Sequence, residues 1–428
     1  MKATRAILDF AGASHTLSPD VRDHAVRLLG DTLAVGAAGV GAPGESAILH
    51  VARAAGANGD ARLIGTAERL PAASAAFVNG YRIHCLEWDA VHEPAVVHAL
   101  SVVTAALGAA IDRHGGVDPD EALAALAVGV DVASGLGLAA DEAMRFFRPA
   151  VCGVMGAALA VARIDGAPLA DALGLAYSSA AGTMQAHVEG LETLPFQIAN
   201  AARAAVLASD LARAGFAGPR DPLEGPFGYF ALFERGTLGR YSGGLGSTWR
   251  IGEVSTKPYP SGRASHAALG LLQEIAPDPA AIEGVELACP PLIRRLVDRP
   301  YSPEMQPAWA RLCLPYLAAL MITDRLIDPR RFSPRDIADP ALGALARKVS
   351  LSDDGNGDPN ALFPQQLTLT WRDGRRETHA IAHTLGSPAN PLSPAQSREK
   401  LNLARDIAPT SADPRIFSDP LAYFTDTA

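Results

Sequence analysis

Charged residues and cysteine are both scarce in this 428-residue chain, and each shortage excludes a class of protein. Only 19% of the residues are charged and the net charge is −9, so the chain has no basic surplus with which to bind nucleic acid. The four cysteines, Cys85, Cys152, Cys289 and Cys313, form no CxxC pair. Their spacing predicts a reduced, cytoplasmic protein without a disulfide framework or a structural zinc site.

Long apolar runs and nucleotide-binding motifs are also missing. The first 20 residues contain no apolar core followed by a cleavage site, so we expect no signal peptide. The most apolar stretches, 122–140 and 149–162, are rich in alanine and glycine, which predicts buried helices and no membrane span. Because no Walker loop, GxGxxG or GxSxG motif is present, the sequence predicts no nucleotide cofactor.

Helical periodicity dominates the first half of the chain. Apolar residues recur at helical spacing, and no segment alternates with period two for long enough to indicate a sheet. These segments predict one helical domain over residues 1–247. The predicted helices are 4–13, 18–38, 44–56, 71–84, 118–138, 149–163, 168–184 and 198–215.

The pattern changes near Gly243. Short segments bounded by Gly, Pro or Asp predict strands, and longer segments at 263–276 and 306–326 predict helices. We therefore expect a mainly α protein whose second domain, 248–390, is a smaller α+β lid. A final helix over 394–406 is expected to pack back on the helical domain, which 391–428 would complete. The predicted strands are 249–254, 283–289, 347–352, 365–371 and 376–382.

One polar stretch stands out against the apolar background of the helical half. Pro94 interrupts it, so its polar groups lie at a helix end and in a loop, where functional side chains are often held. The alternative is a polar loop whose histidines only satisfy local hydrogen bonds. The titratable residues within these fifteen positions are His84, Glu87, Asp89, His92, Glu93 and His98.

A second cluster, Ser255–His266, reads STKPYPSGRASH and precedes an apolar helix. Lys257, Arg263 and His266 can there face an anion near a helix N-terminus. A buried lysine can also lose enough pKa to act as an acid or base. The alternative is a surface turn with ordinary cations.

Weaker candidates lie elsewhere in the chain. Arg148 precedes Pro149 at a helix start and can clamp a carboxylate. Pro315 is expected to kink an apolar helix and present the Tyr316 hydroxyl, although a lone aromatic residue is more often part of a core. A metal site formed by Glu87, Asp89 and His92 is a weaker possibility.

Taken together, these motifs resemble those of the MmgE/PrpD family over nearly the whole chain. The resemblance implies a homodimer that binds a small-molecule carboxylate between its two domains, without metal or nucleotide. The motifs are Asn79-Gly80, His84, Glu87-Trp88-Asp89, His92 and His98, then Lys257–Ser261 with His266, Arg299-Pro300, Pro315-Tyr316 and the closing segment Gly386–Ser393.

The resemblance also implies roles for individual residues. His98 and Lys257 are expected to be the acid/base pair, in unknown order, and Tyr316 is expected to donate to an oxyanion or assist proton transfer. Arg148 and Arg263 would neutralise substrate carboxylates. The remaining residues expected in the substrate pocket are Glu87, Asp89, His92 and His266.

This chain departs from the family pattern at several polar positions. The usual first acid, Asp, is Glu87; a usual His is Arg148; and a usual Lys and His are Leu194 and Gln197. The expected activity is removal of a proton from the carbon next to a carboxylate of a small di- or tricarboxylic acid. The first expectation is a 2-methylcitrate dehydratase-like lyase with an altered substrate. The alternatives are an epimerase of the iminodisuccinate type, a decarboxylase, or a non-catalytic carboxylate-binding homologue.

Overall fold

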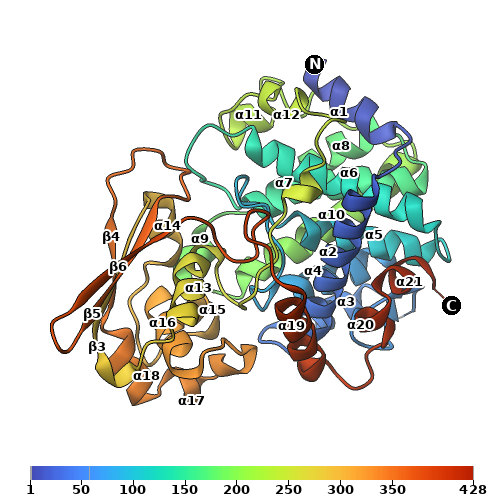
Figure 1. The fold of residues 1–428 in the computed structure, drawn as a ribbon. Helices are drawn as coiled ribbons and strands as arrows, with labels where there is room; N and C mark the ends of the chain where they lie inside the picture. Colours follow the sequence, from blue (N-terminus) through green and yellow to red (C-terminus); the bar gives the residue numbers. More distant parts are fainter. Residues whose placement is uncertain (1, 57, 428) are drawn as a thin grey trace.

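The computed structural model describes residues 2–56 and 58–427 and contains two separate hydrophobic cores. Figure 1 shows a large part made of helices and a smaller part that carries the sheet. The larger core is built from helices, together with a short hairpin of two two-residue strands, β1 (Ala61–Arg62) and β2 (Arg69–Leu70). The smaller core packs helices against a four-stranded sheet. The predicted fold class, a large helical part with a smaller α+β part, is confirmed.

Small residues allow the central helices of the larger core to pack closely. A Cβ atom on Gly156 of α7 would lie 2.3 Å from the carbonyl oxygen of Gly129 on α6, so the two backbones are nearly in contact there. Asp118 caps α6 by accepting hydrogen bonds from the backbone N–H groups of Asp120 and Glu121. The helices are α1 (Lys2–Gly12), α2 (Pro19–Ala38), α3 (Glu45–Ala54), α4 (Ala72–His84), α5 (Ala99–Arg113), α6 (Pro119–Leu138), α7 (Arg148–Asp165), α8 (Leu169–Ser178), α9 (Gln185–Glu189), α10 (Thr193–Arg213), α11 (Tyr229–Leu232) and α12 (Gly239–Ser242).

The C-terminal helices return to this larger core, beside α2 (Figure 1). They are α19 (Pro394–Ile407), α20 (Arg415–Ser418) and α21 (Pro420–Thr425). Ser393 and Gln396 form a reciprocal capping box at the start of α19. Lys400 of α19 is buried and pairs with Asp31 of α2 at 2.5 Å, which fixes the returning helix.

The sheet of the smaller part has the strand order β4-β3-β5-β6. β3 (Ile282–Cys289) runs parallel to β4 (Val349–Asp353) and antiparallel to β5 (Gln365–Trp371), which pairs antiparallel with β6 (Arg376–Ile381). Inward residues of β3 and β5 are buried against α16 and its neighbours. The helices here are α13 (His266–Ile275), α14 (Pro291–Val297), α15 (Pro307–Ala310), α16 (Leu314–Asp324), α17 (Pro334–Ile337) and α18 (Pro340–Ala346).

Three local predictions are wrong. The segment predicted as a strand at 249–254 contains a 3₁₀ helix, Arg250–Glu253, with no strand pairing. The helix predicted over 306–326 is two helices, α15 and α16. Pro315 therefore lies in the first turn of α16, where the missing N–H costs no hydrogen bond, and it kinks nothing. The helix predicted to reach 184 ends at Ser178.

Among the described residues one helix, α6, is long and apolar enough to span a membrane by length and composition alone. About nine-tenths of that stretch (89%) is buried inside the protein, as expected of the central helix of a packed core.

Candidate active site

The two polar segments predicted from the sequence lie side by side. Val91 and Ser255 form an isolated antiparallel bridge, and the Trp88 indole N–H donates to the Pro258 carbonyl oxygen at 3.1 Å. Glu87 adopts a left-handed backbone conformation, with φ of 53°, which is uncommon for a residue other than glycine. Such strain is found most often where a side chain must be aimed at a functional site.

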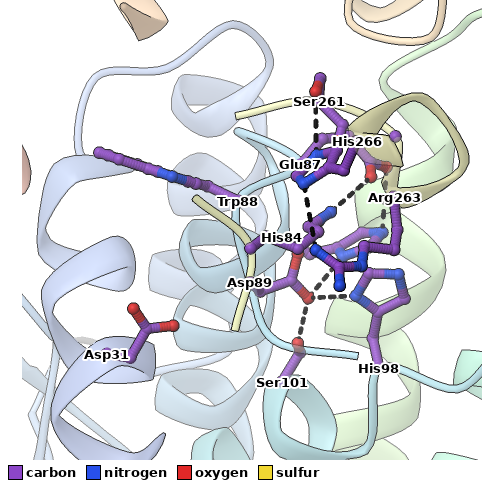
Figure 2. Close-up of polar contacts among 12 residues, drawn as sticks. Asp31, His84, Glu87, Trp88, Asp89, His98, Ser101, Ser261, Arg263 and His266 are labelled. Carbon is purple, nitrogen blue, oxygen red and sulfur yellow. Dashed lines mark hydrogen bonds and ion pairs between the residues drawn. The ribbon is translucent and has the colours of Figure 1, made fainter. Parts of the chain in front are cut away.

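Asp89 is the centre of the cluster (Figure 2). Its carboxylate is fully buried, and its Oδ2 atom accepts hydrogen bonds from three side chains. His84 Nδ1 and His98 Nδ1 each lie 2.9 Å from it, and the Ser101 hydroxyl donates to the same oxygen. Lys257 Nζ lies 3.9 Å from the other oxygen, Oδ1, and 3.3 Å from Glu87 Oε2.

The charges in this cluster follow from burial and from these contacts. Burial lowers the pKa of His98, and the opposing effect of Asp89 does not outweigh it. For His84, burial acts in the same direction, but the Asp89 and Glu87 carboxylates prevail and raise its pKa. Burial disfavours the charge on Asp89, yet the two histidines hold its pKa well below the ordinary value. These directions favour an ionised Asp89, a neutral His98 and a His84 that holds its proton more readily than an ordinary histidine.

The neutral His98 ring has a defined tautomer. Because ionised Asp89 can only accept, His98 Nδ1 must carry the proton, and Nε2 carries the lone pair. His98 precedes α5, and its side chain is 12% exposed, toward a cavity. The arrangement suits a proton acceptor held in place by a buried carboxylate.

The cavity lies between the two cores and has a volume of about 820 Å³, its open mouth included. Its walls are mainly apolar, with side chains such as Met144, Phe147 and Leu296, and a few polar groups converge on it. This composition is typical of a site for a small molecule. The polar residues are His84, Glu87, Glu93, His98, His187, Arg263, Gln365 and Thr384.

Arg263 enters the cavity wall from the smaller part of the molecule. Its guanidinium donates to Glu93 Oε1 at 2.8 Å and to the Leu385 carbonyl oxygen at 2.7 Å. His266 Nδ1 accepts from the same guanidinium at 3.3 Å, and its Nε2 lies 3.1 Å from the Ser261 hydroxyl (Figure 2). Burial, together with Arg263, holds the pKa of His266 well below the ordinary value, so it is a neutral support for that arginine.

The structure places several of the predicted site residues away from the cavity wall. Asp89 and His266 do not line the cavity; each orients a residue that does. His92 is not in the substrate pocket either, because its Nε2 lies 3.0 Å from Glu253 and its Nδ1 accepts from the Ala95 N–H. Lys257 Nζ is fully buried and reaches the cavity only through Glu87, so direct contact with a substrate is not supported.

Two further predicted residues are structural. Arg148 donates to both Glu234 carboxylate oxygens, at 2.7 and 2.8 Å, and to two backbone carbonyls, so each of its three nitrogens is engaged within the protein. Tyr316 lies in the smaller core, and its hydroxyl donates to the Arg331 carbonyl oxygen at 2.7 Å. Neither residue lines the cavity.

Several residues that line the cavity are not among the site residues predicted from the sequence. His84 belongs to the polar stretch but had no predicted role, and Glu93 was not identified as the partner of Arg263. His187 is a lone histidine in QAHVEG, with no motif to mark it. Burial, reinforced by Arg299, lowers its pKa to about 4.

Three of the side chains have the donor types of a metal site. One ligand atom from each of His84, Asp89 and His98 lies within 4.8 Å of the others. Both Nδ1 atoms are hydrogen-bonded to the same carboxylate oxygen, however, and the Lys257 ammonium lies 3.9 Å from the second oxygen. The contacts fit a proton network better than a cation site.

Two family models match this chain, one over its N-terminal part and one over its C-terminal part. The MmgE/PrpD N-terminal domain model matches residues 7–240, and the MmgE/PrpD C-terminal domain model matches residues 259–416. The chain is 27% identical over 424 residues to a cis-aconitate decarboxylase from Mus musculus, covering 91% of this chain and 85% of that protein. It is 28% identical over 354 residues to the Homo sapiens protein of that name, covering 78% and 72% of the two chains.

A fungal relative shows similar coverage. The cis-aconitate decarboxylase of Aspergillus terreus is 26% identical over 418 residues, which cover 87% of this chain and 83% of that protein. The N-terminal match includes the first polar segment, residues 84–98, and the C-terminal match includes Arg263 and His266 of the second. The chain therefore belongs to the MmgE/PrpD family.

Proposed function

We propose that this protein is an enzyme that transfers a proton at a carbon atom next to a carboxylate of a small polycarboxylic acid, with His98 as the transferring group. The observation that carries the proposal is the Asp89–His98 pair, which leaves the Nε2 lone pair of His98 for the cavity. The names of these relatives support a polycarboxylate substrate, because each is called a cis-aconitate decarboxylase or a protein like one.

The cavity supplies the groups that such chemistry needs. When His98 Nε2 takes a proton from carbon, the electron pair of the C–H bond moves onto the adjacent carboxylate as an enolate-like dianion. Arg263 and the protonated form of His84, which the raised pKa favours, line the same cavity and can stabilise the added negative charge. Lys257 helps to keep Glu87 ionised, since it opposes the effect of burial on the pKa of that carboxyl.

Decarboxylation of a cis-aconitate-like acid is the reaction that we place first, because the relatives carry that name. In that reaction the C–C bond to a carboxylate breaks, carbon dioxide leaves, and the remaining electron pair takes a proton from the imidazolium form of His98. Dehydration, in which proton removal is followed by loss of hydroxide, is the second candidate. The epimerase alternative loses its main support because Arg148 is bound to Glu234 and does not face the cavity.

The test measures three readouts with cis-aconitate and with 2-methylcitrate: carbon dioxide release, absorbance of a new unsaturated acid, and deuterium uptake from deuterated water. We expect His98→Asn to lower turnover by more than about 100-fold, the usual scale for loss of an acid/base group. The matched control is His50→Asn, which replaces an exposed histidine on α3 and should leave turnover unchanged. If His98→Asn stayed within about tenfold of the wild type, or 1.4 kcal/mol in the barrier, the proposal would be wrong.

A further inference from the structure

A buried arginine beside the cavity has no hydrogen-bonding side chain or ion-pair partner among the described residues. Arg311 lies just before α16 and is only 3% exposed. Its Nε and Nη1 atoms are buried without a hydrogen-bond partner, and its side chain forms no ion pair with any residue in the described ranges. We infer that Arg311 binds a second carboxylate of the substrate, in a pocket that continues from the main cavity.

The pocket itself joins the candidate active site. Arg311 lines a narrow space whose wall also contains His84, Glu87 and Glu192. His84 and Glu87 line the main cavity as well, as do Leu194 and Leu312. A molecule bound at His98 can therefore extend past His84 toward the Arg311 guanidinium.

The other deeply buried arginines show how unusual Arg311 is. Arg82 pairs with Glu45 at 2.7 Å and donates to the Ile64 carbonyl oxygen at 2.7 Å, and Arg148 is held by Glu234. A buried cation without such partners is strongly unfavourable, because its lost hydration is not replaced. A ligand carboxylate would replace it, and the planar fork of arginine suits two parallel hydrogen bonds.

The surroundings of Arg311 favour an incoming anion. The Phe332 ring lies under the guanidinium, 4.8 Å from its central carbon, and fixes its plane. Glu192 lines the same pocket, and burial raises its pKa although Arg311 opposes that shift, so its carboxyl is a weak counter-ion that forms no ion pair with Arg311 among the described contacts. Glu87 is already engaged by Lys257.

A second arginine, Arg263, limits which acids can be the substrate by the number of carboxylates they carry. Arg263 lines the main cavity, and its Nε is likewise buried without a partner. With one arginine in each part of the continuous space, the substrate needs at least two carboxylates, with the reacting carbon between them near His98. This inference rests on the proposed function, and it adds the number and placement of the carboxylates.

The experiment measures equilibrium binding by calorimetry with three probes: tricarballylate, glutarate and butyrate, which carry three, two and one carboxylates. We expect Arg311→Met to weaken the binding of tricarballylate and glutarate by at least about 30-fold and that of butyrate by less than about threefold. Only an acid with two or more carboxylates can pair with both arginines. Arg311→Lys should recover part of the affinity, since it keeps the charge but not the fork.

Thermal unfolding separates binding from a structural role. Removing an unpaired buried charge should leave the melting temperature of Arg311→Met unchanged or raised, whereas the control Arg82→Met breaks a complete set of contacts and should lower it. Unchanged tricarballylate affinity in Arg311→Met, a melting temperature lowered as in Arg82→Met, or no binding of any probe to the wild type would overturn the inference. Failure of the proposed function is distinct: the wild type would then bind the acids with the predicted dependence on Arg311 but catalyse no proton exchange or decarboxylation.

Discussion

Asp89 determines which nitrogen of His98 can act on a substrate. Replacing Asp89 with Asn would offer an amide that can donate, so the His98 proton would no longer be confined to Nδ1. We expect Asp89→Asn to lower kcat/KM by at least about 100-fold, as is usual when the residue that orients a catalytic histidine is lost. The control is Glu253→Gln, which alters the carboxylate partner of His92 outside the cavity and should change kcat/KM by less than about threefold. A similar small effect for both variants would contradict the role of Asp89.

The pH profile of kcat/KM depends on the direction of proton transfer by His98. Its pKa is lowered below the ordinary 6.5, so the neutral base predominates at neutral pH and is lost only as the pH falls through that lowered pKa. If His98 takes the proton, the rate is constant near neutral pH and falls in acid. If His98 gives the proton, as in decarboxylation, the rate rises as the pH falls toward its pKa. A profile that stays flat through this range in the wild type and in a variant that perturbs His98 would contradict both.

At the scale of elements, the buried pair between α2 and α19 holds the C-terminal helix in place. Lys400 Nζ contacts Asp31 Oδ1 at 2.5 Å and donates to the Trp88 carbonyl oxygen at 3.2 Å, so it joins both helices to the loop that carries Glu87 and Asp89. Lys400→Met leaves Asp31 buried without its counter-ion, and we expect urea unfolding to show a loss of about 3–5 kcal/mol. The double variant Asp31→Leu/Lys400→Met should be more stable than Lys400→Met alone, because no uncompensated charge remains. A single variant within about 1 kcal/mol of the wild type would show that the pair is not needed.

At the scale of the whole molecule, the cavity is formed only when the two cores come together. Glu93 from the larger part pairs with Arg263 from the smaller part, and Asn360 of the smaller part donates to the Glu142 carbonyl oxygen at 3.2 Å. A polycarboxylate bound between the cores would contact both. Substrate binding should therefore stabilise the two parts together against unfolding.

The homodimer implied by the family resemblance stays a prediction, and α10 offers a surface for it. Phe196, Leu207 and Leu211 are 40%, 42% and 44% exposed, and their spacing places them on one face of the helix. We expect light scattering to show a dimer for the wild type and a monomer for Leu207→Glu/Leu211→Glu. Leu326→Glu, which replaces a leucine that is 45% exposed elsewhere, should remain dimeric. A wild-type monomer would refute the homodimer, and a dimeric double variant would refute this surface.

Local pattern was sufficient for most elements and for locating the site. Apolar residues at helical spacing predicted α2, α4 and α6, and short segments between turn residues predicted β3 and β5, because these features depend on each residue's own neighbours in the chain. The two polar segments were also recognisable, since titratable groups are rare in this apolar sequence. The predicted boundaries of the two domains, at 247 and 390, stay predictions.

Tertiary structure alone decided which polar side chain serves which purpose. His92 and His98 lie six positions apart in one loop, yet one is bound to Glu253 and the other faces the cavity, because the backbone path after Pro94 and the packing of α5 aim them differently. Arg148 and Arg311 are both buried, but in the described part of the chain only the first is hydrogen-bonded to an acid. The sequence by itself determined the fold class, and it marked the two polar segments that meet at the candidate site. The burial and partner of each charge, which set its pKa and its role, arose only when distant segments packed together.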